Sequence, residues 1–327
     1  MGNEIITVNR LSKQYHVRTI TEGNIIKRIF SKKKYKEIDA LNDVSFSIQE
    51  GQYVGVIGNN GAGKSTLIKL LTGILYPTAG QVSVMGRNPF NDRIKNNRNI
   101  GVVFGQKTQL KWDLSPLESY DLLKTIYGID DETYKENIKK FVGLFEMEDF
   151  INNPVRSLSL GQRMKCEIAA AFLHNPSIVF LDEPTIGLDV FSKDSILRFL
   201  RSIKEESNAT LILTTHDLEE MNRICDRLII IDKGRTIEED SIEHFTERFT
   251  CSKSIVFCIE GGVWKDFNPI DNEVLTVDNG KVFVSNVRKE RVNEIISLML
   301  ANNTINDVQI IEPNFTEIVK KRIKEGY

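Results

Sequence analysis

The sequence predicts an α/β fold in two parts, a core built around a mostly parallel sheet and a small α+β unit that follows it. Short, fully apolar runs separated by helix-length segments are typical of central strands in a parallel sheet that is covered on both faces. These runs are residues 178–181, 211–213 and 228–231. In addition, a strand at 53–57 leads directly into a glycine-rich loop and a helix, and past about residue 242 short strands alternate with turns. We therefore expect one domain at 1–240 and a second at 241–327.

The composition is that of an ordinary globular protein and excludes several classes. The 327 residues suffice for two domains, and 43 Lys and Arg against 45 Asp and Glu leave a formal net charge of −2. This balance does not favour broad binding to nucleic acid, which depends on basic contacts to phosphates. The four cysteines lack the spacing of a metal site, and no stretch has the length and apolarity of a membrane helix. We expect reduced thiols without chemistry, in a chain that resides in the cytoplasm.

The N-terminal part predicts two strands, at 5–8 and 44–48, with a basic insertion between them. The insertion, at about 17–38, has seven basic and two acidic side chains and therefore a net charge of +5. With its apolar residues it suits an anionic membrane surface or the acidic loops of a partner, and it suits a solvated surface insertion equally well. The sequence leaves these alternatives open.

The next element is the glycine-rich loop GNNGAGKS at residues 58–65, which fits the pattern G-x-x-x-x-G-K-[ST] between a strand and an apolar-periodic helix. Glycines allow backbone N–H groups to turn toward phosphate oxygens, and the helix N-terminus adds its positive dipole end. Lys64 is expected to reach the β and γ phosphates, and the Ser65 hydroxyl to ligate Mg²⁺. The predicted nucleotide-binding residues of this loop are Gly58, Asn59, Asn60, Gly61, Ala62, Gly63, Lys64, Ser65 and Thr66.

Two carboxylates directly follow the apolar run at 178–181. Asp182 is expected to hold the magnesium ion, partly through water, and Glu183 to act as general base toward the attacking water. An isolated Asp-Glu pair means little. At the end of a buried strand and downstream of the glycine-rich loop, however, the pair predicts phosphoryl transfer.

Between about 108 and 176 the pattern becomes helical and predicts a helical subdomain. Within it, LSLGQ at 158–162 precedes an alanine-rich helix, and Ser159 with Gln162 three residues later forms a capping-box pattern. A well-made helix start is a sufficient explanation for that pattern. The functional alternative is that this helix start is aimed at an anion.

The order of these motifs resembles that of the ATP-binding-cassette (ABC) ATPases, and LSLGQ is similar to the signature of that family. The resemblance covers roughly residues 1–240. It implies a P-loop NTPase core of the RecA-like type with a helical signature subdomain, and it implies ATP and Mg²⁺ as cofactors. It also implies roles for four further residues: Tyr15 stacks on adenine, Gln106 links magnesium to the transporter interface, Asp189 lies in a loop that crosses between subunits, and His216 contacts the γ phosphate. The implied catalytic set is Lys64, Gln106, Glu183 and His216.

The resemblance further implies that two copies pair head to tail and enclose each ATP between the glycine-rich loop of one copy and the signature of the other. The signature residues are Ser159, Leu160, Gly161 and Gln162. Leu160 departs from the family, which usually has glycine there, and a side chain is tolerable if it faces away from the nucleotide. A homodimer and a pair with a related subunit both stay open.

The leading hypothesis is therefore the ATPase subunit of a membrane transporter, bound through separate permease subunits to the inner face of the cell membrane. The basic insertion, VVFGQ at 102–106 and the extra C-terminal unit resemble bacterial exporters, which implies export. The surface at 106–118, with Trp112 and Leu114, is the expected dock for a permease helix.

The competing hypothesis is a soluble cassette ATPase that acts on ribosomes or nucleic acid. Such proteins usually have tandem cassettes or a long coiled-coil insertion, and this chain has neither, so we expect no nucleic-acid partner. The unit at 241–327 contains no catalytic cluster. Its role is open among sensing a ligand, strengthening a dimer and capping the cassette.

Overall fold

The computed structural model describes residues 3–19, 34–105, 107–250, 252–259, 269–270, 273–278, 281–311 and 315–325. The chain divides into two compact units, Met1–Asp240 and Ser241–Glu325. Among the described residues, no helix combines the length and the apolarity needed to cross a membrane.

The first unit is built around a six-stranded sheet with the strand order β5-β6-β7-β3-β8-β9. The strands are β3 (Tyr53–Ile57), β5 (Ile100–Phe104), β6 (Ile178–Asp182), β7 (Thr210–Thr214), β8 (Arg227–Asp232) and β9 (Arg235–Ser241). Neighbours from β5 through β8 pair in parallel, and every residue of β3, β6 and β7 is buried. The predicted α/β class with a parallel sheet is therefore confirmed.

The predicted N-terminal strands belong to a separate antiparallel sheet with the order β2-β1-β4. Its strands are β1 (Glu4–Thr19), β2 (Lys34–Gln49) and β4 (Ala79–Val84). Both ends of the predicted basic insertion thus continue these strands, in which Thr19 pairs with Lys34. The rest of the insertion, residues 20–33, lies outside the described residues.

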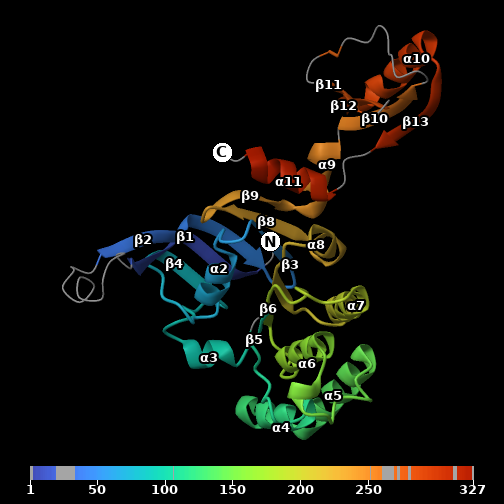
Figure 1. Cartoon of the computed structure of the whole chain (residues 1–327). Helices are drawn as coiled ribbons and strands as arrows, with labels where there is room; N and C mark the ends of the chain where they lie inside the picture. The colour runs from blue at the N-terminus through green and yellow to red at the C-terminus, as the bar shows by residue number, and fades with distance from the viewer. Residues whose placement is uncertain are drawn as a thin grey trace, which may run out of the picture. The chain divides into compact units, whose positions relative to one another are not determined.

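The helices of the first unit lie between the strands in chain order. They are α2 (Lys64–Leu71), α3 (Arg93–Asn97), α4 (Pro116–Tyr127), α5 (Asp131–Phe145), α6 (Leu160–Phe172), α7 (Val190–Glu206) and α8 (Leu218–Ile224). The main core joins β1, β2 and α2 to the parallel sheet through fully buried side chains such as Val44, Leu67 and Ile212. Because α4, α5 and α6 occur together between β5 and β6, they form the helical part of this unit (Figure 1).

The second unit has a four-stranded antiparallel sheet with the order β11-β12-β10-β13. Its elements are α9 (Ile242–Thr250), β10 (Ser252–Ile259), β11 (Val274–Asp278), β12 (Lys281–Arg288), α10 (Val292–Asn302), β13 (Ile305–Ile311) and α11 (Phe315–Glu325). Ile295 and Met299 of α10 pack against Phe257 and Val284 of the sheet. The unit therefore has its own apolar core.

His174, which lies just after α6, should make the folded first unit less stable at low pH. Its Nε2 lies 3.1 Å from the Ile100 carbonyl oxygen, its ring stacks on Tyr127, and burial lowers its pKa to about 4. An unfolded chain takes up this proton near the ordinary pKa of about 6.5. The folded state therefore loses stability as the pH falls from about 6.5 to 4, by about 2 kcal/mol at pH 5.

The variant His174→Phe keeps an aromatic ring beside Tyr127 but cannot titrate. Urea unfolding at pH 7 and pH 5 should show a smaller loss of unfolding free energy in this variant than in the parent chain, by about 2 kcal/mol. Equal losses in the two chains would contradict this assignment.

Candidate functional site

The candidate site lies at the carboxyl edge of the parallel sheet. Strands β3, β6 and β7 run in parallel, so the residues after Ile57, Leu181 and Leu213 emerge at the same edge. These are the glycine-rich loop, the Asp182-Glu183 pair and Thr214. The sheet topology thus brings together residues that are more than a hundred positions apart in the sequence.

The glycine-rich loop turns sharply before α2 begins. Gly63 is the N-cap of α2 and has a φ of 112°, a backbone conformation that residues with a side chain rarely adopt. A Cβ atom there would lie 2.4 Å from the Ala40 carbonyl oxygen, and a Cβ atom on Gly58 would lie 2.2 Å from the Ile231 carbonyl oxygen. The close backbone contacts at these two positions therefore require glycine.

Lys64 points back into this loop instead of into solvent. Its side chain is 5% exposed, and Nζ donates to the carbonyl oxygens of Gly58, at 2.8 Å, and Asn59, at 3.4 Å. The same ammonium lies 3.5 Å from Glu183 Oε1. A buried cation is thus held next to the predicted general base.

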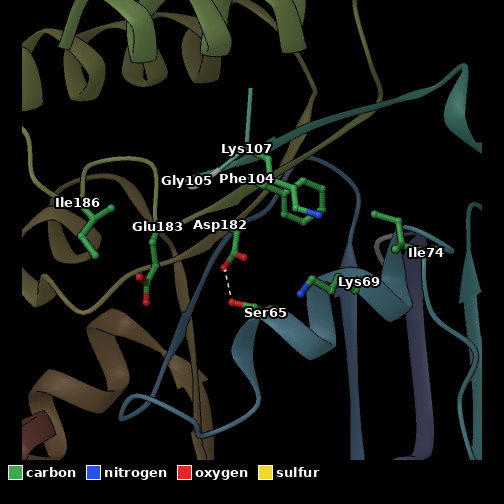
Figure 2. Close-up of a pocket in the computed structure, with 9 residues that line it drawn as sticks. All are labelled: Ser65, Lys69, Ile74, Phe104, Gly105, Lys107, Asp182, Glu183 and Ile186. Carbon is green, nitrogen blue, oxygen red and sulfur yellow. Dashed lines mark hydrogen bonds between the residues drawn. The ribbon is translucent and has the colours of Figure 1, made fainter. Parts of the chain in front are cut away.

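Asp182 accepts two hydrogen bonds through one carboxylate oxygen. Ser65 Oγ donates to Oδ1 at 3.1 Å (Figure 2). Thr214 Oγ1 donates to the same atom at 2.6 Å. The Ser65 hydroxyl and the Asp182 carboxylate are hard oxygen donors, which Mg²⁺ prefers together with water and phosphate oxygens. These two residues therefore fit a magnesium ion.

The backbone at Glu183 has a strained conformation. Its φ is +52°, which is uncommon for a residue with a side chain. The Glu183 N–H donates to the Thr214 carbonyl oxygen at 3.0 Å and lies 3.1 Å from Thr214 Oγ1. These contacts fix the peptide that carries the predicted base at the end of β6.

A pocket of about 230 Å³ opens beside these groups. Its lining consists of Ser65, Lys69, Ile74, Phe104, Gly105, Lys107, Asp182, Glu183 and Ile186 (Figure 2). Three predicted site residues, Ser65, Asp182 and Glu183, thus line one pocket. Tyr15 and His216 do not line it; Tyr15 is half-buried on β1, and His216 is exposed just after β7.

The predicted signature forms the start of α6. Ser159 is its N-cap, and the reciprocal capping box with Gln162 is present. The Cβ that Gly161 lacks would lie 2.2 Å from Ser192 Oγ, so this helix packs tightly against the start of α7. Leu160 is 39% exposed, and none of the four signature residues lines the pocket that holds Ser65 and Asp182.

Of two other predicted site residues, the structure describes Asp189 but not Gln106. Asp189 is the N-cap of α7, where Ser192 donates to its carboxylate from Oγ at 2.7 Å and from N at 2.9 Å. These hydrogen bonds lower the pKa of Asp189. Gln106 lies outside the described residues, so its predicted position is not described.

Sequence reasoning missed a polar cluster formed by residues that follow β6 and β7. Thr185 Oγ1 donates to Glu220 Oε2 at 2.6 Å, and Lys193 Nζ lies 3.0 Å from Glu220 Oε1 and 3.1 Å from Asp217 Oδ2. This cluster joins the loop after Glu183, the start of α8 after His216 and helix α7. Sequence reasoning also missed Thr214, whose only signal was its place at the end of an apolar strand.

This fold and this site define a P-loop ATPase, and comparisons with known proteins identify its family. A family model described as "ABC transporter" matches residues 41–186. The ABC transporter ATP-binding protein NatA of Bacillus subtilis is 34% identical over 220 residues, which cover 67% of this chain and 89% of NatA. The methionine import ATP-binding protein MetN of Staphylococcus saprophyticus is 30% identical over 309 residues, which cover 93% of this chain and 88% of MetN.

A solved structure gives the same result. A dimeric ATP-binding cassette in a post-hydrolysis state with ADP and phosphate superposes with a TM-score of 0.59 at 26% identity, covering 72% of this chain and 98% of that one. The chain belongs to the ATP-binding subunits of ABC transporters. It is an ATPase of that family.

Proposed function

We propose that this chain binds ATP at the glycine-rich loop, hydrolyses it with Glu183 as general base, and thereby drives export through separate permease subunits. The observation that carries the proposal is the convergence of Lys64, Ser65, Asp182 and Glu183 from two separate strand ends. An anion-binding loop, a pair of oxygen donors for a metal ion and a carboxylate base are the parts that phosphoryl transfer requires.

The chain's own residues divide the work in this proposal. Lys64 holds the β and γ phosphates, Ser65 and Asp182 hold Mg²⁺, and Glu183 accepts a proton from the attacking water. Bound Mg²⁺ supplies positive charge to the phosphate oxygens. Tyr15, Gln106 and His216 keep the roles that the family resemblance implies, as adenine platform, link to the metal and contact of the γ phosphate.

The active form in this proposal is a head-to-tail dimer. Ser159, Gly161 and Gln162 are absent from the lining of the pocket in their own chain, which is expected if they act on the ATP of a partner. A related cassette of known structure is dimeric. The partner in this proposal is a second copy or a related ATPase subunit.

The docking surface for the permease, in this proposal, is residues 106–118. Trp112 is 49% exposed there, although aromatic side chains of this size are usually buried. Docking at this surface would hold the chain on the inner face of the cell membrane. Export as the direction rests on the resemblance of the basic insertion, of VVFGQ and of the extra C-terminal unit to exporter subunits.

Affinity purification from gently solubilised native membranes tests this proposal. We expect a polytopic membrane protein to remain bound at low and at high salt. Trp112→Glu and Leu114→Glu should lose it because a charge is placed in the apolar contact, whereas Leu144→Glu, an exposed apolar position on α5, should retain it. Purification of only ribosomal or nucleic-acid partners would contradict the transporter and favour the soluble ATPase.

The direction of transport can be measured separately once that membrane protein is identified. Reconstituted vesicles with the ATPase on the outside should accumulate substrate when ATP is added outside. Loss of internal substrate on adding ATP would instead mean import.

A further inference from the structure

Glu167 of helix α6 is a buried carboxylate that the proposed chemistry does not use. It is 3% exposed, and glutamates are almost never fully buried unless their charge is compensated. Burial raises its pKa, and hydrogen bonds from residues 108–110 oppose that effect more than the charge of Arg163 does. The larger part of the compensation therefore comes from a loop, and the charge of Arg163 adds a smaller part.

That loop is the start of the proposed docking surface. Thr108 Oγ1 donates to Glu167 Oε1, and the Gln109 N–H lies 3.2 Å from Glu167 Oε2. The Gln109 side chain adds a third link, because its Nε2 donates to the Glu167 carbonyl oxygen at 3.1 Å. One residue of α6 thus holds two consecutive residues of the loop.

The other end of the same segment is also fastened near α6. The Arg156 N–H donates to the Trp112 carbonyl oxygen at 3.1 Å, and the Val155 N–H donates to the Leu114 carbonyl oxygen at 2.9 Å. The Arg163 guanidinium lies 5.7 Å above the Trp112 ring. Residues 108–114 are therefore bound at both ends to residues 155–167.

The residues just before this segment belong to the nucleotide side instead. The Gly105 N–H donates to the Asp182 carbonyl oxygen at 2.9 Å, and the Lys107 N–H donates to the Phe104 carbonyl oxygen at 3.0 Å. The change of attachment, from β5 and β6 to α6, thus occurs between Lys107 and Thr108. Thr108, the first residue that Glu167 holds, comes directly after Lys107.

We infer that Glu167 is a positioning residue that makes segment 108–114 move as one body with helix α6. A displacement of the proposed docking surface therefore also displaces the signature at the start of the helix. This inference rests on the proposed function for what the movement does. The fastening itself is a property of the described residues.

Hydrogen exchange of the full chain, followed by mass spectrometry with and without ATP and Mg²⁺, tests this inference. Glu183→Gln is the parent chain, because it should hold ATP without turnover. In the parent, we expect ATP to change exchange in segment 108–114 and in residues 158–167 together. Adding Glu167→Ala should speed exchange in segment 108–114 about tenfold, the scale for losing one hydrogen bond to a charged group, and should abolish its response to ATP while residues 158–167 still respond.

Two further variants separate positioning from general destabilisation. Glu167→Gln keeps an acceptor oxygen, so segment 108–114 should retain part of its ATP response. Cys166→Ala removes a neighbouring buried side chain whose sulfur contacts Met147 and takes no part in the hydrogen bonds to the loop. In this variant, segment 108–114 and residues 158–167 should still respond to ATP together. Exchange in segment 108–114 that is the same in Glu167→Ala as in the parent would overturn the inference, as would an equal loss of response in Cys166→Ala.

Nucleotide binding and the attachment of segment 108–114 to Glu167 are measured separately. Binding of a fluorescent ATP analogue is measured on the same parent sample. Absence of binding there would defeat the proposed function, whereas the exchange of segment 108–114 without nucleotide would still report whether Glu167 holds it.

Discussion

Replacing Glu183 by glutamine lowers ATPase turnover by at least about a hundredfold, the usual scale for loss of a general base, and leaves ATP binding intact. Glutamine keeps the size and the hydrogen-bonding capacity of the side chain but cannot accept the proton of the attacking water. Glu183 lies 3.5 Å from the Lys64 ammonium and lines the pocket with Ser65, so the change is confined to the proposed site.

Steady-state turnover and equilibrium ATP binding measured on the same sample check this result. Glu132→Gln, a similar change at an exposed acid in the first turn of α5, is the matched control and should keep normal turnover. Near-normal turnover in Glu183→Gln would remove the assignment of the base.

Replacing Lys64 by alanine has the second large effect, and it acts on binding. The buried ammonium makes charge-assisted contacts, each of which is worth about 1.5–3 kcal/mol when it meets a charged partner. The Kd for ATP should therefore rise roughly 10- to 100-fold. In contrast with Glu183→Gln, turnover falls here because the nucleotide is held weakly.

Titration with ATP under conditions without hydrolysis measures this Kd directly. Lys95→Ala removes an exposed lysine from α3 and should leave the Kd unchanged. An unaltered Kd in Lys64→Ala would mean that the loop binds nucleotide through its backbone alone.

The fold class was predictable because burial on both faces leaves a direct trace in the sequence. Residues 178–181 and 211–213 read as uninterrupted apolar runs, and they are fully buried strands of the parallel sheet. The strand order β5-β6-β7-β3-β8-β9 was not predictable, because it depends on packing between segments far apart in the chain. For the same reason, the strand signals near Ile6 and Phe46 did not reveal that those strands form a sheet of their own.

The site could be predicted only as far as its residues occur in recognisable spacing. The glycine-rich loop and the Asp182-Glu183 pair have such a pattern, whereas Thr214 is an ordinary β-branched residue of a strand. Glu167 is hidden in a similar way, because a glutamate within a helix is normally solvated. Its partners, Thr108 and Gln109, are almost sixty residues away, so only the folded chain reveals the contact.

The left-handed backbone conformation at Glu183 lowers stability, whereas the side chain at the same position is proposed to be needed for activity. A glycine would adopt this conformation without the roughly 1–2 kcal/mol that it costs an L-residue, but it would remove the carboxylate. If Glu183 is the base, as proposed, selection for thermal stability alone would tend to eliminate it, and selection for turnover would retain the strain. Stabilising substitutions sought in this chain are better placed away from the end of β6, where a gain in melting temperature does not come with a loss of chemistry.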